Sequence, residues 1–347
     1  MEKSNIQIKS AFEIPEKELI EFYAQAFEDR MKYLPHIWRW LNRSDFYDNK
    51  TPLVIEKDGK VIAHTGLTGF NLWLAGKQKT ACWMIDYKIL PQFQRQGLGS
   101  ALSKSLVSVA DCSLGLPNEK SLGTLLKNGW KQYPHSFQVF CFAHIFNHPA
   151  LIGKLPKIIR KTLNIIAFPF VFLIHRVNSY NKKRFKFEKL TDSNFAEFYR
   201  LYKESNAETP TVITPVRDEK YAHWRILQSP NREKYFVYLH KNFGAILLIN
   251  NNHGEYIDVL WVSNNRNFGE IKKMIATLGI FALKRGIAYI RLYSTDNELV
   301  KFLKKNILSK IKSTYLVYFS KNEECFKEME QNEFNLELLD SDMEHIR

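Results

Sequence analysis

The chain has 347 residues, of which 45% are hydrophobic and 25% are charged. This composition excludes a largely disordered protein, and at roughly 150 residues per domain the length predicts two domains. The formal net charge of +14 indicates an anionic partner, and by itself it does not choose among nucleic acid, an anionic membrane and a polyanionic small molecule.

The first part of the chain predicts a mixed α/β domain that ends near residue 148. Apolar residues at three-and-four spacing predict helix within residues 16–41. Two apolar runs on either side of Asp58-Gly59 predict a tight hairpin. The further predicted elements are a helix near 98–110, the strand "CSLGL", a helix near 119–128 with Gly129 as its C-cap glycine, and the strands "WKQY" and "FQVFCFA".

Residues 149–184 predict a basic amphipathic linker. Residues 151–190 hold ten lysines and arginines against one acid, Glu188. Two interpretations of this segment stay open. It is either a helix that packs its apolar side onto one of the domains, or a helix that lies on an anionic membrane surface with its basic residues toward the lipid headgroups.

The remaining residues, 185–347, repeat the order of elements of the first part. The stretch "NFAEFYRLYKES" is similar to "ELIEFYAQAFED", and "AHWRIL" is similar to "HIWRWL". A pair of strands, a further strand, a helix, a strand and a helix then follow in the same order. This pattern predicts a duplicated fold, which closes with the acidic tail "ELLDSDME".

Neither the cysteines nor the N-terminus suggests an exported protein. Cys82, Cys112, Cys141 and Cys325 form no CxxC pair and no spacing typical of a metal site, which favours a reduced cytoplasmic setting and no metal. The N-terminus lacks the apolar core of a secretory signal. The most apolar run, Ile165 to Ile174, has about ten residues, well short of the roughly 20 needed to span a bilayer.

The stretch "PQFQRQGLGS", residues 91–100, joins a predicted strand to a predicted helix. Such a turn points backbone N–H groups inward, and the helix N-terminus adds partial positive charge, so it suits a phosphate. Gly97 and Gly99 allow a tight turn, and Gln94 and Arg95 add side-chain donors. The stretch has neither the GxxxxGK[ST] loop nor the third glycine of GxGxxG. On its own it leaves a simple tight turn open as well.

Two segments together resemble the GCN5-related N-acetyltransferase (GNAT) family. The motif [Q/R]-x-x-G-x-[G/A] is matched at Gln94, Gly97 and Gly99, after a V-x-P-like Ile89-Leu90-Pro91. Downstream, "LPNEKSLGTLLKNGW" resembles the family's N-E-x-[SA]…K-x-G-[FW] segment. The resemblance is close over 81–130 and implies a mixed sheet flanked by helices. The second half resembles a degenerate copy, because its corresponding turn has Gly269 alone.

The resemblance implies an acyl-CoA-dependent N-acyltransferase, with acetyl-CoA bound where two neighbouring strands splay apart. An unprotonated amine would attack the thioester directly, which requires a base and often an acid. The cofactor-binding residues implied in this way are Ile89, Leu90, Gln94, Arg95, Gln96, Gly97, Leu98, Gly99, Ser100 and Asn118.

Five residues are candidates for the proton transfers: Asp86, Glu119, His64, Tyr87 and Tyr133. Asp86 is the first candidate as a base or amine anchor, with a strand-end acid in an ion pair as the alternative. Glu119 is equally suited to the first turn of a helix, and His64 to a structural role. Tyr87 and Tyr133 are candidate acids. Many relatives carry a tyrosine seven residues after the asparagine, and this chain has Leu125 there.

A narrower resemblance, to acetyltransferases that accompany bacterial surface-polysaccharide synthesis, implies a small amine acceptor such as an amino sugar. One alternative is transfer of a longer acyl chain to an amino acid or peptide. Another is a non-enzymatic protein that binds membrane or nucleic acid through its linker, although no nucleic-acid-reading module is apparent. A homodimer, peripheral membrane contact through residues 151–184, and a cytoplasmic or membrane-peripheral location complete the expectations.

Overall fold

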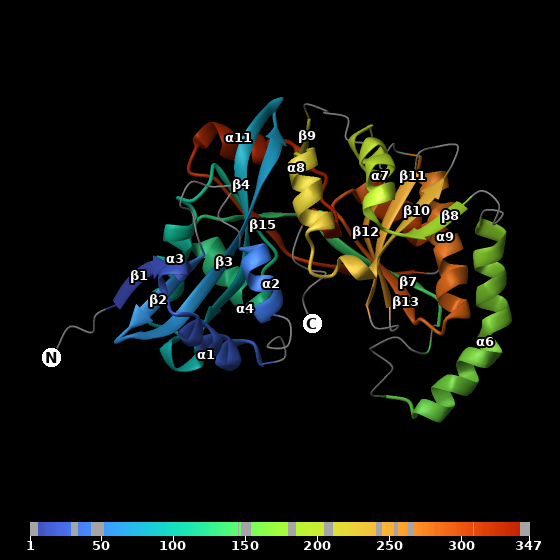
Figure 1. Cartoon of the computed structure of the whole chain (residues 1–347), viewed down its shortest axis with the longest axis horizontal. Coiled ribbons are helices and arrows are strands. Elements are labelled where there is room, and N and C mark those ends of the chain that lie inside the picture. Colours follow the sequence, from blue (N-terminus) through green and yellow to red (C-terminus); the bar gives the residue numbers. More distant parts are fainter. Residues whose placement is uncertain are drawn as a thin grey trace.

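The computed structural model describes residues 6–28, 34–42, 52–144, 146, 154–179, 185–204, 211–240, 245–252, 256–262, 267–307 and 309–340. These residues form two mixed β-sheets, which lie next to each other with helices around them (Figure 1). The predicted mixed α/β class is confirmed.

The first half follows the predicted order of elements. Asp58 and Gly59 have φ values of 50° and 75° in the predicted hairpin. Gly129 has φ 87° just after the helix Glu119–Lys127, as predicted for a C-cap glycine. The elements are β1 (Ile6–Ser10), α1 (Glu16–Ala26), α2 (Leu34–Leu41), β2 (Leu53–Lys57), β3 (Lys60–Leu74), β4 (Lys77–Ile89), α3 (Leu98–Leu106), β5 (Cys112–Gly115), α4 (Glu119–Lys127), β6 (Lys131–Tyr133) and β7 (Phe137–Phe142).

After the linker helix, the second half repeats this order with one inserted strand, Val212–Pro215, and then adds one helix and one short strand at its end. A π-helical turn, His223–Leu227, follows α8. The elements are α6 (Lys157–Asn178), β8 (Phe185–Lys189), α7 (Asp192–Glu204), β9 (Val212–Pro215), α8 (Glu219–Ala222), β10 (Tyr235–His240), β11 (Ala245–Asn252), β12 (Tyr256–Val262), α9 (Phe268–Lys284), β13 (Tyr289–Ser294), α10 (Asn297–Asn306), β14 (Ser309–Ser313), β15 (Leu316–Phe319), α11 (Glu323–Gln331) and β16 (Glu333–Phe334).

The two halves exchange strands. The main path of the first sheet is β1-β2-β3-β4-β5-β15-β6, so β15 from the end of the chain lies between β5 and β6. Besides β15, the first sheet takes β9, which pairs with β3, and β16, which pairs with β9, from the second half. The second sheet has the order β14-β7-β13-β12-β11-β10-β8, so β7 from the first half lies between β14 and β13. The predicted division near residue 148 therefore does not separate the two sheets, because "FQVFCF" completes the second one.

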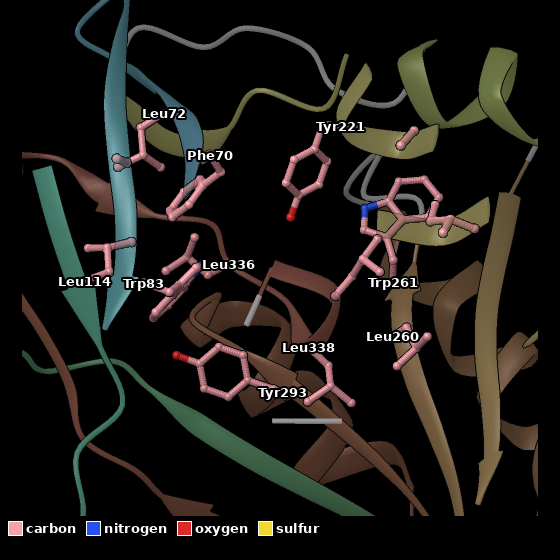
Figure 2. Close-up of a cluster of buried hydrophobic side chains, with 14 of the residues drawn as sticks. Phe70, Leu72, Trp83, Leu114, Tyr221, Leu260, Trp261, Tyr293, Leu336 and Leu338 are labelled. Carbon is pink, nitrogen blue, oxygen red and sulfur yellow. The ribbon is translucent and has the colours of Figure 1, made fainter. Parts of the chain in front are cut away.

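A shared core joins the halves (Figure 2). Phe70, Trp83 and Leu114 enter it from β3, β4 and β5, whereas Trp261 and Tyr293 enter it from β12 and β13. Leu336 and Leu338, near the C-terminus, lie between the two groups (Figure 2). Burial of so many large apolar side chains makes the hydrophobic effect act on both halves together.

The predicted acidic tail is part of this junction as far as residue 340. Glu337 and Asp340 are buried, and the Asp340 carboxylate accepts from the Arg217 guanidinium at 2.6 Å (Nη2 to Oδ2). A buried charge needs such a partner. The rest of the predicted tail, 341–347, lies outside the described residues.

The linker contains the long helix α6, which packs against α9 in the second half. The apolar run of about ten residues, Ile165 to Ile174, was expected to be too short to span a bilayer. That expectation is corrected, because the helix that carries the run has 22 residues. Among the residues described, α6 is the one helix long and apolar enough to cross a membrane by length and composition, and 17% of that apolar window is buried.

Candidate active site

Strands β4 and β5 run parallel and part at their carboxyl ends. They pair from Ala81 with Cys112 to Met84 with Gly115, after which β5 ends and β4 continues to Ile89. Asp86 has φ 48°, and the register between β3 and β4 shifts at this level. These features define a β-bulge, which bends the strand that carries it and increases its twist. Because β5 ends first, the edge of β4 that faces it is left without a described partner strand beyond Met84.

The glycine turn connects the end of β4 with α3, and its two glycines serve different needs. Gly97 has φ 79°, a left-handed conformation that other residues adopt at a cost. Gly99 has an ordinary backbone, but a Cβ there would lie 2.8 Å from the Tyr87 hydroxyl. That hydroxyl donates to the Gly99 carbonyl at 2.6 Å, so Tyr87 holds the start of α3 against β4.

The turn presents backbone donors to solvent. The first N–H groups of α3 have no partner within the helix, and they carry the positive end of its dipole. Gln94, Arg95, Gln96 and Gly97 are exposed, and the Gln94 amide donates to the Ile89 carbonyl at 3.1 Å. This arrangement fits the two phosphates of a pyrophosphate.

Other predicted cofactor residues use their side chains within the protein. Leu90 and Leu98 are buried, and the Ser100 hydroxyl donates to the Asn128 side chain. The Asn118 side chain caps α4 by accepting from the N–H groups of Lys120 and Ser121 at 3.0 and 3.1 Å. At Leu90, Leu98, Ser100 and Asn118, contact with a cofactor would therefore come through the backbone.

His64 and Asp86 meet at the bulge. His64 is fully buried; its Nε2 lies 3.0 Å from the Tyr23 hydroxyl and its Nδ1 lies 3.2 Å from the Asp86 carbonyl. Nδ1–H thus donates to the carbonyl while Nε2 accepts from Tyr23, a tautomer assigned from this network. Both ring nitrogens are engaged, so the geometry gives His64 the role of fixing the bulge. Tyr23 had no predicted role in the site, since in the sequence it is one member of an apolar stripe.

The remaining candidates lie in different places. Glu119 is exposed in the first turn of α4, directly after the carboxyl end of β5 and on the side of the sheet edge where the glycine turn lies. Tyr133 is in β6, from which β15 separates β5, and its ring packs on Phe334 in the shared core. Burial raises the pKa of Tyr133 and raises that of Tyr87 to about 12. Leu125 is fully buried beside Leu106 and Trp130.

The family comparison agrees with this geometry. Residues 12–129 match the family model described as the acetyltransferase (GNAT) family. This part, about a third of the chain, resembles a GNAT domain. The match spans the bulge, the parting strands and the glycine turn, and it confirms the predicted acyltransferase class. No curated protein sequence gives a match.

Solved structures with the GNAT fold resemble both halves of the chain. A GCN5-related N-acetyltransferase from Kribbella flavida has a TM-score of 0.57 at 13% identity, over 91% of this chain and 71% of that one. The N-myristoyltransferase of Saccharomyces cerevisiae, solved with myristoyl-CoA and inhibitors, has a TM-score of 0.56 at 11% identity, over 91% and 80%. The GCN5-related glucosamine N-acetyltransferase region of a fungal multi-domain GH3 β-N-acetylglucosaminidase has a TM-score of 0.56 at 13% identity, over 92% and 38%. Similarity at these identities concerns the fold.

The second half has a comparable parting of strands, but its own chain fills it. β12 and β13 pair in parallel from Tyr256 to Val259 and then separate. Into this gap comes the C-terminal segment, where the Glu337 carboxylate accepts from the Val262 N–H at 3.1 Å. A cavity here is lined by Val259, Ile271, Leu292, Leu299 and Glu337 among others. Burial raises the pKa of Glu337 to about 8.

The described residues contain no group of three or more histidine, cysteine or acidic side chains arranged to hold a metal ion. The four cysteines are buried and form no disulfide. Of the two similar halves, the N-terminal one therefore offers the exposed glycine turn, next to the point where the pairing of β4 and β5 ends.

Proposed function

We propose that this chain transfers an acetyl group from acetyl-CoA to the primary amine of a small acceptor. The observation that carries the proposal is the parting of β4 and β5 at the Asp86 bulge, next to the glycine turn of α3. The exposed N–H groups of the turn suit the CoA pyrophosphate. The amides of the pantetheine arm can bond to the free edge of β4 as an added strand would.

Asp86 is the residue we propose for the acceptor amine. It is 8% exposed and lies at the bulge, where a carboxylate can hold an ammonium group or take its proton through a water molecule. The deprotonated nitrogen then attacks the thioester carbonyl, the C–N bond forms and the C–S bond breaks. Glu119, exposed at the same edge, is the second candidate base.

The proton on the departing sulfur is proposed to come from water. Leu125 has no proton to give, and the Tyr87 hydroxyl is bound to the Gly99 carbonyl with a raised pKa. A CoA thiolate is a stable enough leaving group near neutral pH to depart without a dedicated acid. In this scheme Tyr87 and His64 position the turn and the bulge, respectively.

An amino sugar is the first acceptor to test. A GCN5-related glucosamine N-acetyltransferase region has the same overall fold, which supports the choice by analogy. The fold also occurs in an N-myristoyltransferase with bound myristoyl-CoA, so the donor series should run from acetyl-CoA to myristoyl-CoA. Release of free CoA, measured with a thiol reagent, gives the rate of acyl transfer for each pair of donor and acceptor in the same assay.

The decisive experiment compares two glycines in calorimetric titrations with acetyl-CoA. Gly97→Glu places bulk and negative charge at the proposed phosphate site, and it should abolish binding. Gly97→Ala imposes the same strain of positive φ without the charge, so it should weaken binding less. Gly269→Glu is the matched control at the start of α9, where Gly269 is exposed and has an ordinary φ, and it should bind as the parent does. Equal losses from Gly97→Glu and Gly269→Glu, or no binding of any acyl-CoA by the parent, would reject the proposal.

A further inference from the structure

Helix α6 presents a large apolar surface to solvent. Six of its apolar side chains are at least 60% exposed: Ile158, Ile165, Ile166, Phe170, Leu173 and Val177. Soluble monomers rarely expose a continuous apolar patch of this kind unless it binds something.

These side chains lie on one side of the helix. At 100° per residue they fall within an arc of about 140°, and Ile159, which is 46% exposed, lies in the same arc. The opposite side carries the buried residues of α6, which are Asn164, Val171 and His175. The more apolar side of α6 thus faces away from the protein, contrary to the interpretation in which it packs onto a domain.

The inner side of α6 is fixed to the second sheet and to the helix α9 that packs on it. The His175 Nε2 donates to the Phe142 carbonyl of β7 at 2.9 Å, and the His175 ring lies so close to Gly279 of α9 that no side chain fits at that position. Near the other end, the Asn164 side-chain oxygen accepts from the Phe146 N–H at 3.0 Å. These contacts hold the exposed apolar side in a fixed direction.

Positive charge lies near both ends of the apolar side. Residues 149–184 contain eight lysines and arginines and no acidic residue. Lys154, Lys157 and Lys161 are exposed near the start of α6, and Arg176 is exposed near its end. Apolar side chains flanked by lysine and arginine are typical of helices that lie in the interface of an anionic bilayer.

We propose that α6 docks this chain on an anionic membrane surface, with the helix parallel to the bilayer plane and its apolar side among the acyl chains. A second copy of the chain is a poor occupant, because two such helices face to face would bring their positive charges together. Spanning would break the contacts of Asn164 with Phe146 and of His175 with β7 and α9. Figure 1 shows α6 at one end of the molecule and α3 toward the other, so docking leaves the glycine turn accessible from solution.

Vesicle flotation with the full-length chain tests this inference. Vesicles of phosphatidylcholine alone are compared with vesicles that also contain phosphatidylglycerol, an anionic lipid. The parent chain should float with the anionic vesicles, and raising the salt concentration should weaken binding. The double variant Ile166→Asp, Leu173→Asp should not float, because it places two charges among the acyl chains. Ile20→Asp is the matched control, since Ile20 is 40% exposed on α1.

A second pair of variants separates the charge contribution. Lys161→Gln with Arg176→Gln should weaken binding to anionic vesicles by about thirtyfold, whereas Lys304→Gln with Lys305→Gln, on the exposed part of α10, should leave it unchanged. The docking proposal fails if the parent does not bind anionic vesicles, or if the apolar double variant binds them as well as the parent does. It also fails if the bound protein resists alkaline carbonate extraction, because that would indicate a spanning helix. Finally, it fails if α6 mediates a dimer in solution that Ile166→Asp, Leu173→Asp abolishes. Acyl-CoA binding, measured in parallel, should be the same in the parent and in all four variants, which are the two in the flotation experiment and the two that change charge.

Discussion

Trp40 and Trp224 hold each other across the junction of the two halves. The indole N–H of Trp40 donates to the Trp224 carbonyl at 3.1 Å, and the indole N–H of Trp224 donates to the Trp40 carbonyl at 3.1 Å. Their ring centroids are 5.5 Å apart. Trp40 comes from "HIWRWL" in α2 and Trp224 from "AHWRIL" after α8, the two stretches whose similarity suggested a duplicated fold.

Replacing either tryptophan should destabilise the whole chain. Trp40→Phe or Trp224→Phe removes one donor and leaves a carbonyl in the junction without its partner, which costs about 1–3 kcal/mol. The double variant should cost less than the sum of the single variants, because the two bonds depend on the same contact. Urea unfolding followed by circular dichroism measures all four proteins. Purely additive costs would mean that the two bonds act independently.

The Tyr87 hydroxyl gives a prediction that separates positioning from acid catalysis. Tyr87→Phe removes its bond to the Gly99 carbonyl, so α3 is held less firmly at the glycine turn. We expect KM for acetyl-CoA to rise by about two- to tenfold, as for one neutral hydrogen bond, with kcat nearly unchanged. Tyr133→Phe is the control in the shared core. A loss of kcat by about a hundredfold or more at unchanged KM would instead identify Tyr87 as the acid.

Features that depend on a few adjacent residues were predictable from the sequence. The Asp58-Gly59 hairpin, the Gly129 cap and the two-glycine turn each follow from local backbone chemistry, and the structure has all three. The strand exchange was not predictable in this way. The alternation in "FQVFCF" predicts a strand, but any open sheet edge can accept it, and the choice between the two sheets depends on which edge lies next to it.

In the candidate site, too, the local features were predictable from the sequence and the long-range contacts were not. Spacing and resemblance identified the glycine turn, whereas the role of His64 depends on Tyr23, 41 residues earlier in the chain. The bulge at Asp86 is a backbone feature that side-chain patterns do not report. Glu337 was assigned to an acidic tail because its neighbours in the sequence are acidic, although in the structure it fills the gap between β12 and β13.

Leu125 offers a test of the missing proton donor. Leu125→Tyr restores the residue type found in many relatives, but the side chain at this position is fully buried. Overpacking should lower the free energy of unfolding by about 1–3 kcal/mol, and kcat should not rise. Thermal unfolding and steady-state kinetics measure the two effects. An increase in kcat with a new basic limb in the pH profile would show that the position faces the reacting sulfur.

Glu337 should make stability depend on pH. Its pKa in the folded chain is about 8, above the ordinary value of 4.5, so between these values the folded chain binds more protons than the unfolded chain. Stability should therefore fall as the pH rises through this window. The buried His175, with its pKa lowered by burial, acts in the opposite direction below about pH 6.5. Melting temperatures between about pH 6.5 and 8.5 should decline less in Glu337→Gln than in the parent; equal slopes would assign the decline to other groups.

The strand exchange predicts that residues 1–148 will not fold alone. Without β15, the β5 backbone loses its antiparallel partner from Ser113 to Gly115, and β6 loses the strand that connects it to the sheet. β7 would also remain unpaired, since both of its partners belong to the second half. Unpaired edges of this kind favour aggregation. We expect the fragment 1–148 to be insoluble or to lack a cooperative unfolding transition by circular dichroism.

A rearranged fragment separates this cause from mere truncation. Residues 1–134 joined through a flexible linker to residues 314–334 omit β7 and supply β15 between β5 and β6. If the missing strand is the main defect, this fragment should be more soluble than 1–148 and should be stabilised by acetyl-CoA, because the glycine turn and the bulge are both within it. The matched control carries Val317→Asp, which places a charge at a fully buried position opposite Gly115. Cooperative folding of 1–148 itself would mean that the first sheet needs no strand from the second half.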